Sequence, residues 1–309
     1  ITCSPAEEPE LFWATVGGVG LTGVILSLRL RLRRVESAWI SADYERCPNL
    51  DAALDTLDAT DRDFPYSVGW VDCMARDESL GRTVLMRGRH AHPSQLPPGR
   101  AGRPLEIPRR MNVSVPVDFP QFILNPYSIR AFNDLFYFLN RPVAGRLVDY
   151  EKYFFPLDRI LHWNRMYGRR GFVQYQATFP MEGRAGLRRL LEKCSLARRA
   201  SFLAVLKRFG AAGNGLLSHP MPGYTLTLDL PNTPGLEPFL REMDQILLEH
   251  GGRLYLAKDA AAAPETIAAM YPRLDEFRDV CRGVDPEGLL GSDLSRRLNI
   301  TTGGGADHE

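Results

Sequence analysis

The order of apolar patterns between residues 171 and 257 is the feature that most limits how this chain can fold. Four period-two runs predict strands and two runs with three-to-four-residue spacing predict helices. The expected strands are residues 171–179, 201–209, 223–230 and 253–257, and the expected helices are residues 183–196 and 236–250. Strand–helix–strand–strand–helix–strand is the order of a ferredoxin-like unit. We therefore expect an α+β fold, with an antiparallel sheet covered by helices on one face and free to cover a ligand on the other.

A glycine-rich stretch near the start, Gly18-Val19-Gly20-Leu21-Thr22-Gly23, fits the GxGxxG pattern of dinucleotide-binding loops. Its surroundings are reversed, because a helical turn at residues 8–15 precedes it and an alternating strand-like run at residues 24–33 follows it. A Rossmann loop needs a helix after the glycines, since the pyrophosphate sits on that helix's N-terminus. The sequence predicts helix, loop and strand, in which glycines let the backbone approach a ligand closely. A tight turn without a ligand is the alternative.

Weaker patterns organise the rest of the chain. Helices are expected at residues 48–60, 129–139 and 157–167, and strands at residues 66–72 and 81–90. Five prolines between residues 92 and 110 predict a loop or crossing segment. Residues 264–298 should be largely helical, and the Gly-rich polar residues 301–309 should form a disordered tail.

Composition excludes several classes of protein. The 309 residues are 44% hydrophobic and 24% charged, as in an ordinary globular protein, and the net charge of +1 gives no reason to expect nucleic acid. The five cysteines are widely spaced without a CxxC pair, and the histidines form no ligand set, so neither a disulfide framework nor a metal site is expected. No apolar run approaches the length of a membrane span, and no signal peptide is visible. A reducing compartment is the simplest inference from the cysteines.

Polar residues on otherwise apolar strands are the candidates for chemistry. Gln174 and Gln176 are two residues apart and therefore point to the same face of a strand, where they could bind a polyol or a carbonyl. Lys207 and Lys258 each lie at the end of an apolar strand. The alternatives are an exposed face for the glutamines and lysines whose ammonium groups reach solvent.

Several stretches of this sequence resemble one family of flavoproteins. The segment ELFWATVGGVGLTG is similar to the last part of the FAD-binding domain in proteins of the vanillyl-alcohol-oxidase type. YSVGWVD, FFPLD, WNRMYGRRGFVQYQ, SFLAVLKRFG, GGRLYLAKD, MYPR and SDLSRRL resemble the decaprenylphosphoryl-ribose 2-oxidases of that type. The resemblance extends from Glu10 to about Leu298.

The resemblance implies a division of the chain. Residues 1–35 would be the C-terminal part of an FAD-binding domain, residues 36–290 a substrate domain, and residues 291–300 a return to the FAD domain. The chain would then be an N-terminally truncated flavoenzyme, inactive alone and a weak binder of FAD.

Site residues can be carried over from the family one by one. The resemblance places the adenine part of FAD near the glycine loop, with Gly17, Gly18, Gly20, Gly23 and Ile25. It implies that Tyr255 contacts the flavin and that Lys258 is the active-site lysine near flavin and substrate. Gln174, Gln176, Lys207 and Trp70 would belong to the substrate pocket.

The pocket also departs from the mycobacterial members of the family. Thr227 stands where they have a cysteine, Thr225 and Tyr224 replace an asparagine and a tryptophan, and Phe154 replaces a tyrosine. These changes leave the exact sugar and lipid carrier open.

The function that the resemblance implies is oxidation of the C2 hydroxyl of a polyprenyl-phosphate-linked pentose to a ketone. This would be the first step of an epimerisation that supplies an arabinan precursor for the cell wall. FAD would be the cofactor, a short-chain NAD(P)-dependent reductase the partner, and the lipid substrate a reason for peripheral membrane association. A flavin oxidase of a free sugar, lactone or hydroxy acid is one alternative, and a non-catalytic binding module is another.

Overall fold

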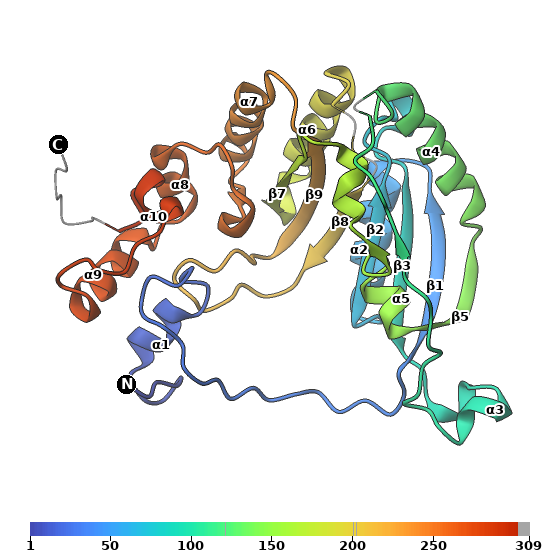
Figure 1. The fold of residues 1–309 in the computed structure, drawn as a ribbon, viewed down its shortest axis with the longest axis horizontal. Helices are drawn as coiled ribbons and strands as arrows, with labels where there is room; N and C mark the ends of the chain where they lie inside the picture. Colours follow the sequence, from blue (N-terminus) through green and yellow to red (C-terminus); the bar gives the residue numbers. More distant parts are fainter. Residues whose placement is uncertain (121, 200, 202, 302–309) are drawn as a thin grey trace.

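An eight-stranded antiparallel sheet is the centre of the structure, a computed structural model that describes residues 1–120, 122–199, 201 and 203–301 (Figure 1). Its strand order is β10-β7-β9-β8-β2-β3-β1-β5. The strands are β1 Trp39–Cys47, β2 Tyr66–Val71, β3 Thr83–His90, β5 Val143–Asp149, β7 Phe172–Pro180, β8 Ala204–Phe209, β9 Gly223–Pro231 and β10 Arg253–Leu254. Two short strands, β4 Val113–Ser114 and β6 Ile160–Leu161, pair in parallel beside it.

Helices connect and cover these strands. The α-helices are α1 Pro9–Thr15, α2 Leu50–Thr60, α3 Pro98–Ala101, α4 Pro126–Leu139, α5 Tyr150–Phe154, α6 Arg184–Leu196, α7 Leu236–Glu249, α8 Pro264–Met270, α9 Leu274–Val284 and α10 Asp293–Arg297. Short 3-10 helices are η1 Asp77–Ser79, η2 Pro93–Gln95, η3 Trp163–Tyr167, η4 Met181–Gly183 and η5 Leu256–Lys258. In the described part of the chain, none of the helices combines the length and apolar character that crossing a bilayer requires.

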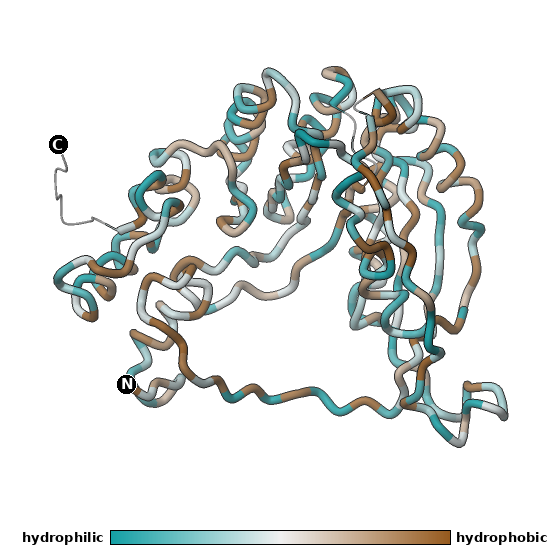
Figure 2. The backbone as a smooth tube through the Cα atoms, in the orientation of Figure 1, coloured by the Kyte–Doolittle hydropathy of each residue, from teal (hydrophilic) through white to brown (hydrophobic). Residues whose placement is uncertain are grey.

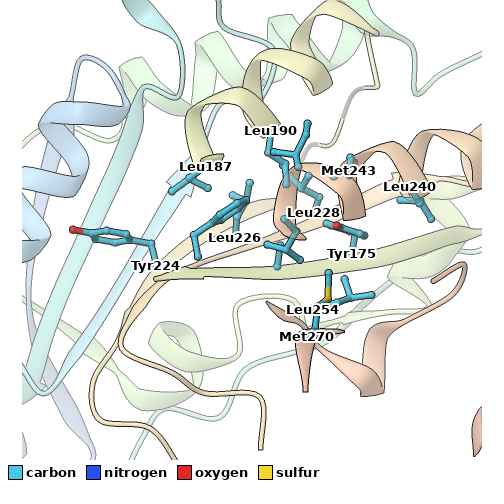
Figure 3. Packing of buried hydrophobic residues seen from close by; sticks show 14 of the residues in the cluster. Tyr175, Leu187, Leu190, Tyr224, Leu226, Leu228, Leu240, Met243, Leu254 and Met270 are labelled. Carbon is cyan, nitrogen blue, oxygen red and sulfur yellow. Dashed lines mark hydrogen bonds between the residues drawn. The ribbon is translucent and has the colours of Figure 1, made fainter. Parts of the chain in front are cut away.

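The ferredoxin-like unit is confirmed. Strands β7, β8, β9 and β10, with α6 and α7 between them, lie side by side in the order β10-β7-β9-β8, and every pair is antiparallel. Alternate residues of β7 and β9 point to α6 and α7 and are almost fully buried, among them Tyr175, Phe179, Leu226 and Leu228. Figure 3 shows this packing between the sheet and the two helices. The α+β class predicted from the sequence is therefore correct.

The second half of the sheet is covered on both faces. Its order β5-β1-β3-β2 repeats that of the first unit, and α2 packs through Leu54 and Leu57 into the same core as α6. The α4 helix lies on the opposite face, where Phe136 packs against Trp70 with ring centroids 4.5 Å apart. The seam between the halves is the short pairing of β2 with β8.

Two local predictions are wrong. Residues 24–33 are extended but form no strand, because no described residue pairs with their backbone; Figure 2 shows them running alone, with alternating colours. All their large apolar side chains are exposed, Leu26 by 93%. Residues 157–167 are not an α-helix but β6 followed by η3, since the left-handed backbone of His162 interrupts them. Strands β1 and β5 were not predicted at all.

Other expectations have mixed outcomes. Helices α2 and α4, strands β2 and β3, and the helical character of residues 264–298 agree with prediction. The proline-rich residues 92–110 contain only η2 and α3. The domain boundaries stay a prediction; α1 packs on α9, and Ala14 and Leu21 share one apolar core with Leu298 and Ile300. Residues 302–309, the expected tail, lie outside the described residues.

Truncating the buried face of β9 should destabilise the whole fold. The Leu228 side chain is fully buried between sheet and helices, so Leu228→Ala should lower the free energy of unfolding by about 2–5 kcal/mol in urea titrations. Leu26→Ala removes the same atoms from a 93% exposed position and should change it by less than about 0.5 kcal/mol. Equal losses in the two variants would contradict this account of the core.

Candidate functional site

The face of the ferredoxin-like unit opposite α6 and α7 carries a row of polar side chains. Strand register places Gln176 opposite Thr227, and Thr227 opposite Val205. Gln174 lies opposite Asp229, and Lys207 opposite Thr225. Because residues opposite one another in a ladder share a face, these side chains of three neighbouring strands all point away from the helix-covered core. The predicted substrate residues of β7, β8 and β9 are thus brought together.

The polar side chains on this face bond to one another. The Gln174 Nε2 amide donates to Asp229 Oδ1 at 2.8 Å, and the Gln176 Nε2 amide donates to Thr225 Oγ1 at 3.2 Å. Thr225 is fully buried, whereas Gln176 and Thr227 are half-buried and Lys207 is exposed. The face is therefore a preorganised polar surface rather than a fully solvated one.

Tyr255 is held in place from two sides. Its backbone N–H donates to Gln176 O at 2.9 Å, directly after β10 leaves the sheet edge. Its ring stacks on the imidazole of His219 with centroids 4.7 Å apart and an interplanar angle of 27°. His219 Nε2 lies 3.0 Å from Thr178 Oγ1, a buried residue of β7. Tyr255 consequently presents a rigid ring at the edge of the polar face.

Lys258 follows three residues later, at the end of η5. Its side chain is half-buried, and burial lowers the pKa of its ammonium, which the negative charge of Asp229 raises and the positive charge of Lys207 lowers again. Burial likewise lowers the pKa of His219 to about 4, with the nearby charges of Arg253 and Lys258 acting in the same direction. The edge of the face therefore combines a cationic lysine with a neutral imidazole at neutral pH.

The two aromatic candidates lie on the same face of the sheet but in its other half. Trp70 in β2 is opposite Val205 and is packed under Phe136 of α4. The ring of Phe154, at the end of α5, packs edge-on against the ring of Tyr66, with the ring centroids 4.9 Å apart. They form an apolar boundary beside the polar row, and their contact with a substrate stays a prediction.

The glycines of the loop fall into two groups. Gly17 and Gly18 are packing positions: a Cβ on Gly17 would meet Ser218, and one on Gly18 would meet Ala14 O and Phe277. Gly20 and Gly23 have positive φ angles of 81° and 146°, and a Cβ on either would have no neighbour within 4 Å. No helix starts at Gly20, which excludes the Rossmann arrangement. Ser218 touches Gly17 and is followed by His219, so the loop and the Tyr255 stack are adjacent.

Sequence reasoning missed His219 and Asp229. His219 lies in a loop without a periodic pattern, so nothing in the sequence distinguished it. Asp229 could have been found, because it continues the Thr225 and Thr227 alternation on β9 in the same way as Gln174 and Gln176 pair on β7. Among the described residues there is no group of three or more His, Cys, Asp or Glu side chains that could hold a metal ion.

Solved structures with the same arrangement are sugar-oxidising and related proteins. A xylooligosaccharide oxidase from Myceliophthora thermophila C1 in complex with xylobiose superposes with a TM-score of 0.59 at 14% identity, over 97% of this chain and 63% of that one. The BBE-like protein 28 from Arabidopsis thaliana gives 0.51 at 13% identity, over 94% and 62%. The fold is that of the FAD-linked oxidases.

Sequence comparison finds relatives of higher identity. The chain is 36% identical to the decaprenylphosphoryl-β-D-ribose oxidase of Mycolicibacterium smegmatis, over 95% of this chain and 64% of that protein. It is 33% identical to a Streptomyces coelicolor protein encoded in the mprA 5′ region, over 94% of this chain and 81% of that protein. Residues 227–298 match the D-arabinono-1,4-lactone oxidase family. The chain belongs to the same family as the Streptomyces coelicolor protein and is similar to the decaprenylphosphoryl-β-D-ribose oxidase, of whose length it spans less than two thirds.

The residues present fit FAD, the cofactor that these relatives imply. Gly20 and Gly23 leave their backbone open to close approach in conformations that side chains rarely adopt. Ser218, next to Gly17, and His219, stacked on Tyr255, connect the glycine loop to the polar face. There Tyr255 offers a flat ring, and the neighbouring polar side chains offer hydrogen-bonding groups. The roles of individual glycines and of Ile25, which is 63% exposed, stay predictions.

The neutral state of His219 can be tested directly. Because burial lowers its pKa to about 4, its imidazole signals in a carbon-13 histidine-labelled NMR titration should stay those of the neutral ring down to about pH 5. In urea the same ring should titrate near its ordinary value of about 6.5. His219→Gln identifies the signal. A midpoint near 6.5 in the folded chain would show that the stack on Tyr255 is solvated.

Proposed function

We propose that this chain forms the substrate-facing part of an FAD-dependent oxidase that converts a secondary hydroxyl of a polyprenyl-phosphate-linked pentose to a ketone. The observation that carries the proposal is the convergence of Gln174, Gln176, Lys207 and Lys258 on one sheet face beside Tyr255. Polar groups set in an apolar surround are what fixes the orientation of a sugar in a binding site. The identity of 36% to a decaprenylphosphoryl-β-D-ribose oxidase supports this choice of substrate.

Bound FAD would supply the acceptor for the hydride that leaves the sugar carbon. The residues of this chain then orient the sugar and control its hydroxyl proton. The amides of Gln174 and Gln176 and the hydroxyl of Thr227 can donate to and accept from the pentose hydroxyls. Lys258 places a positive charge beside them, which stabilises negative charge that develops on the reacting oxygen. The rigid Tyr255 ring limits the positions that the sugar can take.

The exposed Lys207 favours a substrate that carries a phosphate. It lies beside Thr225 in the same row, and its ammonium is free to meet an anion at the solvent-facing side. The aromatic boundary of Trp70 and Phe154 would cover the apolar part of the substrate next to the phosphate. A lipid-linked substrate would bring the protein to a membrane surface, and a short-chain NAD(P)-dependent reductase would complete the epimerisation.

Oxidation of a free sugar or lactone is the second candidate. It is favoured by the match of residues 227–298 to the D-arabinono-1,4-lactone oxidase family and by the threonines at positions 225 and 227. Such a substrate carries no phosphate and would not require Lys207. The two candidates therefore predict different effects of the same substitution.

Loss of the Lys258 ammonium should affect turnover more than cofactor retention. In the FAD-loaded enzyme, Lys258→Ala should lower kcat by about a hundredfold, the usual scale for one group that handles a proton or its charge. The flavin absorbance per protein should be nearly unchanged. Lys152→Ala, at an exposed position of α5, is the control and should alter neither quantity. Flavin loss with normal turnover per bound flavin would assign Lys258 to cofactor binding instead.

Substitution of Lys207 should separate the two candidate substrates. For a polyprenyl-phosphate pentose, Lys207→Met should raise KM roughly tenfold, since a charge-assisted contact contributes about 1.5 kcal/mol. For a neutral aldonolactone, KM should not change. Steady-state assays with both substrates give the answer. Efficient lactone oxidation together with no turnover of the phosphate-linked sugar would select the second candidate.

A further inference from the structure

The side of α4 that faces solvent is apolar. Tyr127, Leu135, Phe138 and Leu139 are exposed by 79%, 58%, 60% and 69%, and Phe132 by 42%. Phe132, Phe138 and Leu139 each lie three or four residues from Leu135, and residues at this spacing share one face of a helix. These five residues form the outer face of α4. Surface helices of globular proteins carry polar residues on their solvent side, so this face has the composition of a surface that is normally covered.

The opposite side of α4 fixes this orientation. Ile129 and Asn133 are buried, and the Asn133 Nδ2 amide donates to Asp72 Oδ1 at 2.7 Å. Phe136 packs on Trp70 of β2. The helix therefore cannot turn its outer face toward the sheet without breaking these contacts. Figure 1 shows α4 on the outside of the molecule, at the end away from α8, α9 and α10.

The surroundings of the outer face are positively charged. Residues 101–170 contain eleven Lys and Arg residues against six Asp and Glu residues, whereas the whole chain has a net charge of only +1. Arg130 lies beside the outer face and Arg141 follows the helix; both are exposed, and neither forms a salt bridge with a described residue. Asp134, the acidic residue of α4, is paired with Arg82. The outer face thus combines exposed apolar side chains with uncompensated positive charge.

An anionic bilayer provides both kinds of contact that this surface offers. Aromatic and leucine side chains of an interfacial helix enter the boundary between the headgroups and the acyl chains, while basic residues attract the lipid phosphates. The side chains of the outer face protrude from a convex helix, whereas the anchor residues of protein interfaces fill pockets of complementary shape. A fluid bilayer requires no such complementary shape. The geometry and the charge together favour a membrane over a protein partner.

We propose that the outer face of α4 docks this protein on an anionic membrane, with the helix lying in the plane of the interface. The proposal rests on the proposed function in one respect, because a polyprenyl-phosphate substrate is itself held in a membrane. Phe132 lies next to Phe136 with ring centroids 6.0 Å apart, and Phe136 packs on Trp70 of the aromatic boundary. Docking through α4 therefore brings the lipid surface to the edge of the candidate site.

The test is cosedimentation of the whole chain with vesicles, in the absence of flavin and substrate. The unsubstituted chain should bind vesicles of phosphatidylglycerol and phosphatidylcholine. Leu135→Gln/Leu139→Gln should bind at least about tenfold more weakly, because two apolar side chains no longer enter the bilayer. The matched control is Leu26→Gln/Leu30→Gln, the same chemical change at two leucines that are 93% and 68% exposed in the extended residues 24–33. This control should bind as the unsubstituted chain does.

The charge requirement is tested independently. A basic residue near an anionic surface strengthens binding about fivefold, so Arg130→Gln/Arg141→Gln should weaken binding to the phosphatidylglycerol vesicles at least about fivefold. Binding of the unsubstituted chain should also fall as salt is added and should be weaker on vesicles of pure phosphatidylcholine. Equal binding to both kinds of vesicle would contradict the part of the proposal that requires anionic lipid.

Three results overturn the docking face itself. These are equal binding of the unsubstituted chain and Leu135→Gln/Leu139→Gln, a loss confined to Leu26→Gln/Leu30→Gln, and no binding of the unsubstituted chain to vesicles. In the last case, dissociation of a dimer by Leu135→Gln/Leu139→Gln in analytical ultracentrifugation would assign the outer face to contact between copies of the chain. All four leucines are exposed, so the variants should keep the melting temperature of the unsubstituted chain. Because no substrate is oxidised in these measurements, failure of the proposed reaction would be seen separately, in the substrate assays.

Discussion

The register between β7 and β9 is the constraint on which the rest of the structure depends. The pairing runs from Phe172 opposite Pro231 to Pro180 opposite Gly223 without a bulge. Side chains alternate between faces along both strands, so this register sends Tyr175 and Leu228 into the core and Gln176 and Thr227 to the other face. A slip by one residue in either strand would bury amides and expose leucines. The same pairing thus creates the core and the candidate site.

The structure of a segment can be predicted from the sequence where the local periodicity of its apolar residues determines that structure. The unit of β7, α6, β8, β9, α7 and β10 was predictable because strict alternation and strong helical faces follow each other within ninety residues or so of chain. Residues 24–33 alternate just as clearly but form no strand, since a strand requires a hydrogen-bonded neighbour and alternation cannot supply one. Strands β1 and β5 were not predicted, because β1 is partly polar and the exposed β5 lacks a clear apolar face.

The candidate site shows the same division. Periodicity alone placed Gln174 and Gln176 on one face, whereas only the strand register shows that Lys207 shares that face. His219 was not, because its position depends on a loop that packs between the glycine turn and Tyr255. Tyr255 and Lys258 were predicted from the family resemblance. The backbone hydrogen bond from Tyr255 N–H to Gln176 O holds this segment against β7. Long-range loop contacts of this kind leave no periodic signal in the sequence.

The location of the polar row follows from what covers each half of the sheet. On the β2 side of the seam, α4 places Phe136 over Trp70, and α5 places Phe154 against Tyr66. On the β8 side the described chain places only the short η3 and η5 over the face and no α-helix, so Lys207 stays exposed and Lys258 only half-buried. Partial burial matters for two reasons. Opposite charges attract each other more strongly at a half-buried site than in water, and a half-buried charge is still accessible to a ligand. A fully covered face would have excluded the lysines, and a fully open one would have screened Asp229 from Lys258. The edge of the aromatic cover is therefore where a pair of coupled charges and a row of hydrogen-bonding groups can coexist.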